Sequence, residues 1–88
     1  MVYLIYVNYF DKEENKLLEL LKIGYTDNLD KTLAEFRDAN PSFILLKTRE
    51  GDKDKWRYLC KKFEFYQYGN WDSWFYYSQD IVDNFIYD

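Results

Sequence analysis

Two short apolar runs near the N-terminus constrain the fold more than any other feature of the chain. Val2–Val7 and Leu20–Thr26 are both rich in β-prone residues, and about a dozen residues separate them. The middle of that connection, Asp11–Asn15, is polar. Two β-prone runs around a polar tip are typical of a hairpin. Gly24 lies near the end of the second run, and a helix-capping segment follows it, so the sequence predicts strand, tip, strand, cap and helix.

The first strand is predicted over Val2–Phe10, with apolar residues on both of its faces. A strand that is apolar on both faces usually lies inside a sheet. The second run is ambiguous, because Lys16–Tyr25 also carries a leucine pattern that could open a helix. The nearby first strand and Gly24 favour a strand over Leu18–Tyr25.

Hydrophobic periods and capping residues predict the remaining elements. Asp27 or Asn28 is expected to cap the first helix, Asp52 or Asp54 the second, and Ser78 the third. The predicted elements are a helix at Asn28–Ala39, a strand at Ser42–Thr48, a helix at Lys53–Tyr66, a loop at Gln67–Ser73, a strand at Trp74–Tyr77, and a helix at Gln79–Tyr87 with Ile81, Val82, Phe85 and Ile86 facing inward.

These elements predict an α+β fold, with a small, mostly antiparallel sheet led by the N-terminal hairpin and flanked by three helices. A chain of 88 residues is expected to form one domain over residues 1–88. Its 23% aromatic content can build a core without disulfides, but ten tyrosines exceed what a small core holds. Several tyrosines are therefore expected at the surface, where a group of them indicates an interface.

Other features of the composition exclude some classes of function. Cys60 is the single cysteine, so no internal disulfide can form, and together with the lack of a secretory leader this indicates a cytoplasmic setting. No apolar run approaches the about 18 residues that a membrane span needs. The chain has no histidine, which disfavours zinc sites and Ser-His catalysis.

The charges are unevenly distributed along the chain, whose net charge is -4. Residues 63–88 contain five carboxylates and no Lys or Arg, whereas basic residues crowd Lys47–Lys62. This pattern predicts a polarised surface on which the basic stretch is mainly a solvated helix face. The acidic balance disfavours strong binding to a nucleic-acid backbone.

Several segments, in order, resemble the GIY-YIG endonuclease superfamily. Val-Tyr-Leu-Ile opens the chain, Leu-Lys-Ile-Gly-Tyr-Thr follows at 21–26, and a helical segment follows at 28–41. The pattern is most similar to the small phage and viral branch, whose second motif is written Lys-Ile-Gly. The segments at 56–66 and 72–86 resemble the second conserved helix of that family and its closing Trp-Phe strand with the last helix.

The resemblance implies a metal-dependent DNA nuclease, in which two tyrosines, a helix Arg and a later Glu surround the scissile phosphate. Three of those four groups are missing here. Lys22 stands where the second Tyr would be, a substitution that this branch commonly makes. Thr32 occupies the position of the Arg, and Trp56 occupies that of the Glu, which holds one divalent ion. The resemblance therefore implies a degenerate site without metal or catalytic residues, whose remnant positions are Tyr3, Lys22, Gly24, Tyr25, Thr32 and Trp56.

The sequence also allows other interpretations of these residues. Tyr3 and Tyr25 also fit plain sheet tyrosines with hydroxyls near water, and Trp56 fits a core residue. The alternative function is an active DNA endonuclease that depends on Mg²⁺ or Mn²⁺, with a rearranged site in which Glu50 or Glu64 supplies the carboxylate.

An irregular segment rich in aromatic residues is the best candidate for a binding surface. Aromatic side chains beside Gly, Asn and Gln combine rigid contact area with adaptable hydrogen bonding. The alternative is that these aromatic side chains fold back and cap a thin core. The candidate binding residues are Tyr66, Tyr68, Asn70, Trp71 and Asp72.

The sequence thus favours a non-catalytic protein-binding module on a nuclease-like scaffold, without a cofactor. Its expected partner is a protein, for example a nucleic-acid enzyme, with weak or no binding to nucleic acid and none to membranes. By analogy with the small branch that it resembles, the chain would serve a phage or virus as an accessory or counter-defence protein, acting in the host cytoplasm.

Overall fold

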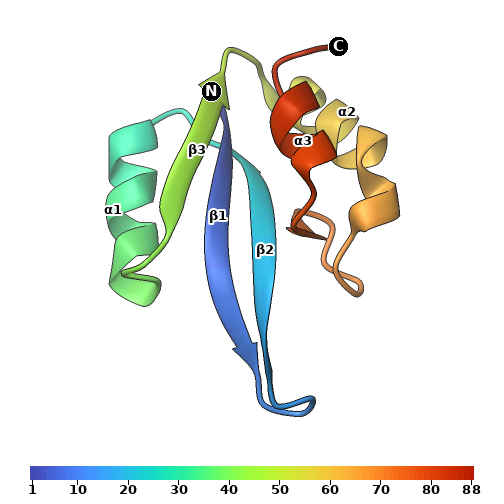
Figure 1. The fold of residues 1–88 in the computed structure, drawn as a ribbon. Coiled ribbons are helices and arrows are strands. Elements are labelled where there is room, and N and C mark those ends of the chain that lie inside the picture. The colour runs from blue at the N-terminus through green and yellow to red at the C-terminus, as the bar shows by residue number, and fades with distance from the viewer.

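The computed structural model describes all residues 1–88 and confirms the predicted α+β class. Four strands and three α-helices follow one another along the chain, with a short 3₁₀ helix after the second α-helix (Figure 1). The elements are β1 (Val2–Asp11), β2 (Lys16–Tyr25), α1 (Leu29–Ala39), β3 (Ile44–Arg49), α2 (Lys53–Lys62), the 3₁₀ helix η1 (Glu64–Tyr66), β4 (Trp74–Tyr76) and α3 (Gln79–Asn84).

The sheet is antiparallel throughout and has the order β3-β1-β2-β4. The position of β1 inside the sheet confirms the prediction from its two apolar faces. The hairpin pairs Val2 with Tyr25 at its base and Asp11 with Lys16 at its end. The ambiguous second run is therefore a strand, and it begins at Lys16, two residues earlier than predicted.

Side chains alternate between the two faces of the sheet, so each face builds its own core. The helices α2 and α3 cover one face, and α1 covers the other (Figure 1). The first core contains Val2, Leu4, Leu21, Ile23, Leu59, Phe63, Phe75, Ile81 and Phe85. The second core contains Tyr3, Ile5, Val7, Leu20 and Phe43, against which Leu29, Leu33 and Phe36 of α1 are partly buried.

The far half of the hairpin extends beyond the helices (Figure 1). On one edge β3 pairs with β1 only as far as Tyr6, and on the other β4 pairs with only three residues of β2. Three large apolar side chains of this half are about half exposed or more, namely those of Tyr9 (48%), Phe10 (50%) and Leu17 (62%). The expected group of surface aromatic residues therefore begins on the hairpin.

Each predicted helix has a polar residue at its N-cap. The side chain of Asn28 accepts a hydrogen bond from the Lys31 amide at 3.1 Å. The carboxylate of Asp52 accepts one from the Lys55 amide at 3.1 Å, and the hydroxyl of Ser78 accepts one from the Asp80 amide at 3.2 Å. These bonds satisfy backbone donors that a helix leaves free at its first turn.

Two predicted helix ends are wrong. The second helix ends at Lys62 rather than Tyr66, because the chain tightens into η1 after the C-cap Phe63. The last helix ends at Asn84, and Ile86, expected to face inward, is 47% exposed. Phe85 already fills the core at this point, so the residue after it turns toward solvent.

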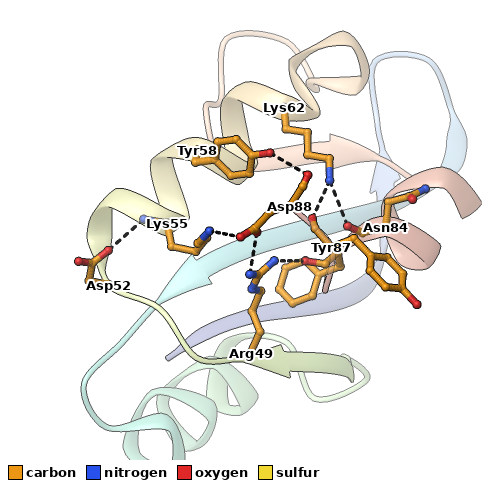
Figure 2. Close-up of polar contacts among 9 residues, drawn as sticks. Arg49, Asp52, Lys55, Tyr58, Lys62, Asn84, Tyr87 and Asp88 are labelled. Carbon is orange, nitrogen blue, oxygen red and sulfur yellow. Dashed lines mark hydrogen bonds and ion pairs between the residues drawn. The ribbon is translucent and has the colours of Figure 1, made fainter.

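Basic side chains hold the segment that follows α3 (Figure 2). Arg49 donates to the Phe85 carbonyl at 2.8 Å and pairs with the Asp88 carboxylate at 2.8 Å. Lys55 pairs with the same carboxylate at 2.7 Å, and Lys62 donates to the Tyr87 carbonyl at 2.7 Å. The interpretation of the basic stretch as a solvated face is therefore wrong for Arg49 and Lys55, which are partly buried and bind the Asp88 carboxylate, whereas Lys62 remains exposed.

Candidate functional site

Two remnant positions of the nuclease-like pattern, Tyr3 and Gly24, contact each other. Tyr3 pairs with Gly24 across β1 and β2. Its ring lies so close to the glycine that a β-carbon at residue 24 would meet Tyr3 Cζ at 2.2 Å. Tyr3 is only 4% exposed, and burial raises the pKa of its hydroxyl. Tyr3 is therefore a sheet tyrosine that packs in the second core, as one interpretation expected.

Lys22 lies on the same face of the sheet as Tyr3, two residues before Gly24. Its ammonium lies 3.3 Å from Ser73 Oγ and 5.1 Å from the ring centroid of Trp74. Burial lowers the pKa of Lys22. The lysine is therefore held by the start of β4 and the residue before it.

The side-chain hydrogen bonds of Tyr25 and Thr32 are local. The Tyr25 hydroxyl donates to Asp27 Oδ1 at 2.6 Å, and the Thr32 hydroxyl lies 2.7 Å from that of Thr26. The second contact ties the first turn of α1 to the end of β2. Tyr25 also packs against the first core, so it is a sheet tyrosine with its hydroxyl at the surface, as one interpretation expected.

Trp56 is half-buried on α2 and packs against the first core. Its indole Nε1 donates to the Ile23 carbonyl at 2.8 Å. Because α1 and α2 cover opposite faces of the sheet, Thr32 and Trp56 belong to helices that the sheet separates. The structure contains no group of three or more His, Cys, Asp and Glu side chains placed to hold a metal ion.

A cavity of about 350 Å³ lies beside Trp56. Glu64 and Glu50 are the two carboxylates of the alternative, rearranged site. Glu64 lines this cavity and pairs with Lys61 at 3.2 Å, whereas Glu50 does not line it. Burial raises the pKa of Cys60 to about 11. The lining residues are Trp56, Arg57, Cys60, Lys61, Glu64, Gln67 and Asp72.

The five candidate binding residues between Tyr66 and Asp72 do not form one surface. Tyr66 packs against the first core and donates to Asp80 Oδ2 at 3.1 Å. Tyr68 packs against the second core, on the opposite face. Asn70, Trp71 and Asp72 are exposed, with Trp71 at 63%. The two tyrosines fold back, as the alternative interpretation expected, whereas the tryptophan remains available for binding.

A second cavity, of about 280 Å³, gathers four aromatic side chains from three segments of the chain. We call it the aromatic pocket and define it by Tyr9 of β1, Trp74 of β4, and Tyr68 and Trp71 of the loop between η1 and β4. It opens on the face that α1 covers, just past Asn40 at the end of that helix. Its other lining residues are Val7, Asn8, Leu20 and Asn40.

Backbone hydrogen bonds fix the walls of the aromatic pocket. The Tyr68 amide donates to the Trp74 carbonyl at 2.9 Å, the Trp71 amide to the Tyr68 carbonyl at 3.2 Å, and the Trp74 amide to the Trp71 carbonyl at 3.1 Å. Gly69 adopts a φ of +59°, which a glycine tolerates best in so tight a loop. Phe36 of α1 stacks on Trp74, with ring centroids 6.3 Å apart. These contacts make the pocket a preformed part of the fold.

Negative charge lies near one wall of this pocket. Asp11 follows Tyr9 by two residues, so both side chains leave β1 on the same face. Burial raises the pKa of the Tyr68 hydroxyl, and the Asp11 and Glu14 carboxylates raise it further. Glu14 is paired with Lys16 at 2.8 Å. No Lys or Arg lines the pocket.

Sequence reasoning found Tyr68 and Trp71 but missed their partners Tyr9 and Trp74. The signal in the sequence that could have found them is the alternation of side chains between the two faces of a strand. Val7 and Tyr9 share a face of β1, and Trp74 lies on the face opposite to the buried Phe75. That signal gives the face of each residue, but it does not show where α1 stops covering the sheet.

Comparisons with known proteins add no relative. No protein-family model matches the sequence, and no curated protein and no solved structure matches it. In addition, no helix of the structure combines the length and the apolar character that crossing a membrane requires. The function is therefore inferred from the site itself.

Proposed function

We propose that this protein is a non-catalytic module that binds a protein partner through the aromatic pocket, on a scaffold that resembles the GIY-YIG nucleases. The observation that carries the proposal is the pocket itself, with Trp71 exposed at 63% beside a preformed aromatic cavity. Tyrosine and tryptophan dominate the energetics of many protein interfaces, because each buries a large area and loses little conformational entropy.

The exposed surface around the pocket supports this proposal. Tyr9 and Tyr76 are both nearly half exposed, and each lies edge to face with Tyr68. Together with Trp71 they form an apolar area of the kind that marks interaction sites on soluble domains. The net charge of -4 favours a basic partner, of which a nucleic-acid enzyme is one example.

The absence of catalysis is proposed from the side chains at the two key positions of the family pattern. Thr32 bonds to Thr26, and Trp56 bonds to a carbonyl of β2, so both positions serve the fold. Neither a guanidinium nor a carboxylate stands where the resemblance places them. Phosphodiester cleavage by this family's chemistry requires both a counter-charge and a fixed metal ligand.

A pull-down with a pair of matched variants tests the binding function. Trp71→Ala removes the exposed aromatic residue of the pocket, and Phe65→Ala removes one that is 89% exposed but does not line that pocket. We expect wild type and Phe65→Ala to retain a protein that Trp71→Ala does not retain. Direct titration of that purified protein should give the same order of affinities. Equal retention by all three proteins would contradict the proposal.

A plasmid-nicking assay with Mg²⁺ or Mn²⁺ tests the claim that the module is non-catalytic. We expect no cleavage above the buffer control. Metal-dependent nicking that Tyr3→Phe or Glu64→Gln abolishes would instead support the alternative endonuclease. A salt series of DNA binding completes this test, because a phosphate-binding surface gives a steep loss of affinity with salt.

A further inference from the structure

We propose that the aromatic pocket receives a methylated lysine side chain of the protein partner. This inference rests on the proposed function, since it names the group that the partner inserts. Four aromatic side chains line one cavity, and recognition of methylated and quaternary ammonium groups by aromatic cages is an established use of that arrangement.

The rings present walls in different orientations. Tyr9 and Tyr68, two of the lining residues, have ring centroids 6.4 Å apart and ring planes 62° apart. A cation is attracted to the negative face of an aromatic ring. Walls that meet at steep angles can surround a compact cation on several sides, whereas a parallel stack of rings would leave no space between them.

The charges near the pocket favour a cation over a neutral group. Asp11 lies beyond Tyr9 on the same face of β1, and its Oδ1 accepts from the Glu13 amide at 3.0 Å, which fixes the carboxylate at the hairpin tip. Glu14 lies in the same tip but is paired with Lys16 at 2.8 Å. Asp11 forms no ion pair of its own, although it faces Lys16 across the hairpin.

One cation of the protein itself lies close by. The Lys22 ammonium is 5.1 Å from the centroid of Trp74, although Lys22 does not line the pocket. This contact places a cation on one of the pocket's own rings. It also repels a second cation, so removing the Lys22 charge should strengthen the binding of a cationic ligand and leave a neutral ligand unaffected.

Methylation distinguishes the proposed ligand from ordinary lysine. An unmodified ammonium is compact and strongly hydrated, so entering an apolar cavity removes favourable water contacts. A trimethylammonium group keeps its charge but presents methyl groups to the rings. The cavity of about 280 Å³ also leaves room for the methylene stem along Val7 and Leu20.

The test uses three amino-acid probes. The binding of each probe is monitored by the indole fluorescence of the full protein and by chemical-shift changes. The probes are Nα-acetyl-trimethyllysine amide, Nα-acetyl-lysine amide, and a neutral analogue in which carbon replaces the quaternary nitrogen. We expect the trimethyl probe to bind roughly tenfold more tightly than either of the others, the difference that a desolvated cation–π site provides. Equal binding of the neutral analogue, or no binding of the trimethyl probe, would overturn the inference.

Variants separate this inference from a merely apolar cavity. Trp71→Ala should abolish binding and Phe65→Ala should not change it, since Phe65 does not line the pocket. Asp11→Asn keeps an oxygen for the tip amides and should weaken the trimethyl probe a few-fold, while Lys22→Met should strengthen it. Either charge variant acting equally on the neutral analogue contradicts the inference.

The failure of this inference can be told from the failure of the proposed function. If a protein partner still depends on Trp71 but the probes show no preference for the cation, only the methylated-lysine ligand is wrong. If no partner depends on Trp71, the proposed function is wrong as well.

Discussion

The phenol ring of Tyr3 lies against the backbone of Gly24, its partner across the β1–β2 pair. Both residues belong to the pattern that resembles the GIY-YIG family. Their positions are accounted for by mutual packing, because the ring occupies the space that a side chain at residue 24 would need. A glycine here needs no phosphate or substrate nearby to explain it.

This contact predicts that Gly24→Ala destabilises the fold. A β-carbon at residue 24 would lie 2.2 Å from Tyr3 Cζ, and the ring cannot move freely because it is buried in the second core. Overpacking of this kind costs about 1–3 kcal/mol of the free energy of unfolding. Urea denaturation of the variant measures the loss. In a Tyr3→Leu background the same alanine should cost less, and an equal cost in both backgrounds would contradict the packing explanation.

Trp56→Phe is predicted to destabilise the protein through a lost hydrogen bond. The indole Nε1 donates at 2.8 Å to the carbonyl of Ile23, a residue with no exposed surface. Phenylalanine keeps much of the ring packing but leaves this carbonyl without its indole donor, at a cost of about 1–3 kcal/mol. Thermal and urea unfolding provide the measurement. Trp71→Phe is the matched control, because Trp71 is exposed and its ring donates no hydrogen bond, so its effect should stay within about 0.5 kcal/mol.

The contacts of Asp88 predict a contribution to stability that acid removes. Hydrogen bonds from Lys55 and Arg49 hold the pKa of Asp88 below its ordinary value of 3.8 (Figure 2). A lowered pKa in the folded state stabilises the fold above pH 3.8, and this contribution is lost as the pH falls through the lowered pKa.

Unfolding curves of wild type and Asp88→Asn measured against pH check this prediction. Wild type should be the more stable near neutral pH, and the two curves should converge as the pH falls below 3.8. Added salt should narrow the difference at neutral pH, because the carboxylate is exposed. Asp38→Asn, which removes a carboxylate without an ion pair, controls for the change in net charge. A difference that persists unchanged in acid would exclude this linkage.

Much of the fold could be predicted because its signals are local. The polar tip between two β-prone runs specified the hairpin, and the N-caps Asn28, Asp52 and Ser78 specified where the helices begin. The errors lie where contacts between distant residues decide the outcome. Ile86 fits the period of α3, but Arg49 and Lys62 hold the chain after that helix in a different path.

The candidate site was less predictable for the same reason. Trp71 and Tyr68 could be predicted as binding residues because they are aromatic residues in an irregular segment. Tyr9 and Trp74 have the pattern of ordinary strand residues. The pocket exists because the hairpin extends past α1 and because the loop before β4 brings Tyr68 and Trp71 close to Tyr9. That arrangement depends on the relative lengths of elements far apart in sequence, which no single motif records.

Cys60 is predicted to react slowly with alkylating agents. Burial raises the pKa of its thiol from 9.0 to about 11, so near neutral pH the thiolate fraction is roughly a hundredfold smaller than that of an ordinary cysteine. Because only the thiolate reacts, the rate should rise about tenfold per pH unit up to about pH 11. Iodoacetamide labelling followed by mass spectrometry, with protein unfolded in urea as the reference, measures both rates.

Lys22 gives this prediction an internal control. Its ammonium lowers the pKa of Cys60, and it does so against the larger effect of burial. Lys22→Met should therefore raise that pKa further and slow the labelling of the folded protein, while the rate in urea stays the same. Faster labelling of the folded variant would mean that the substitution had opened the packing around α2, and an unchanged rate would mean that Lys22 exerts no field at the thiol.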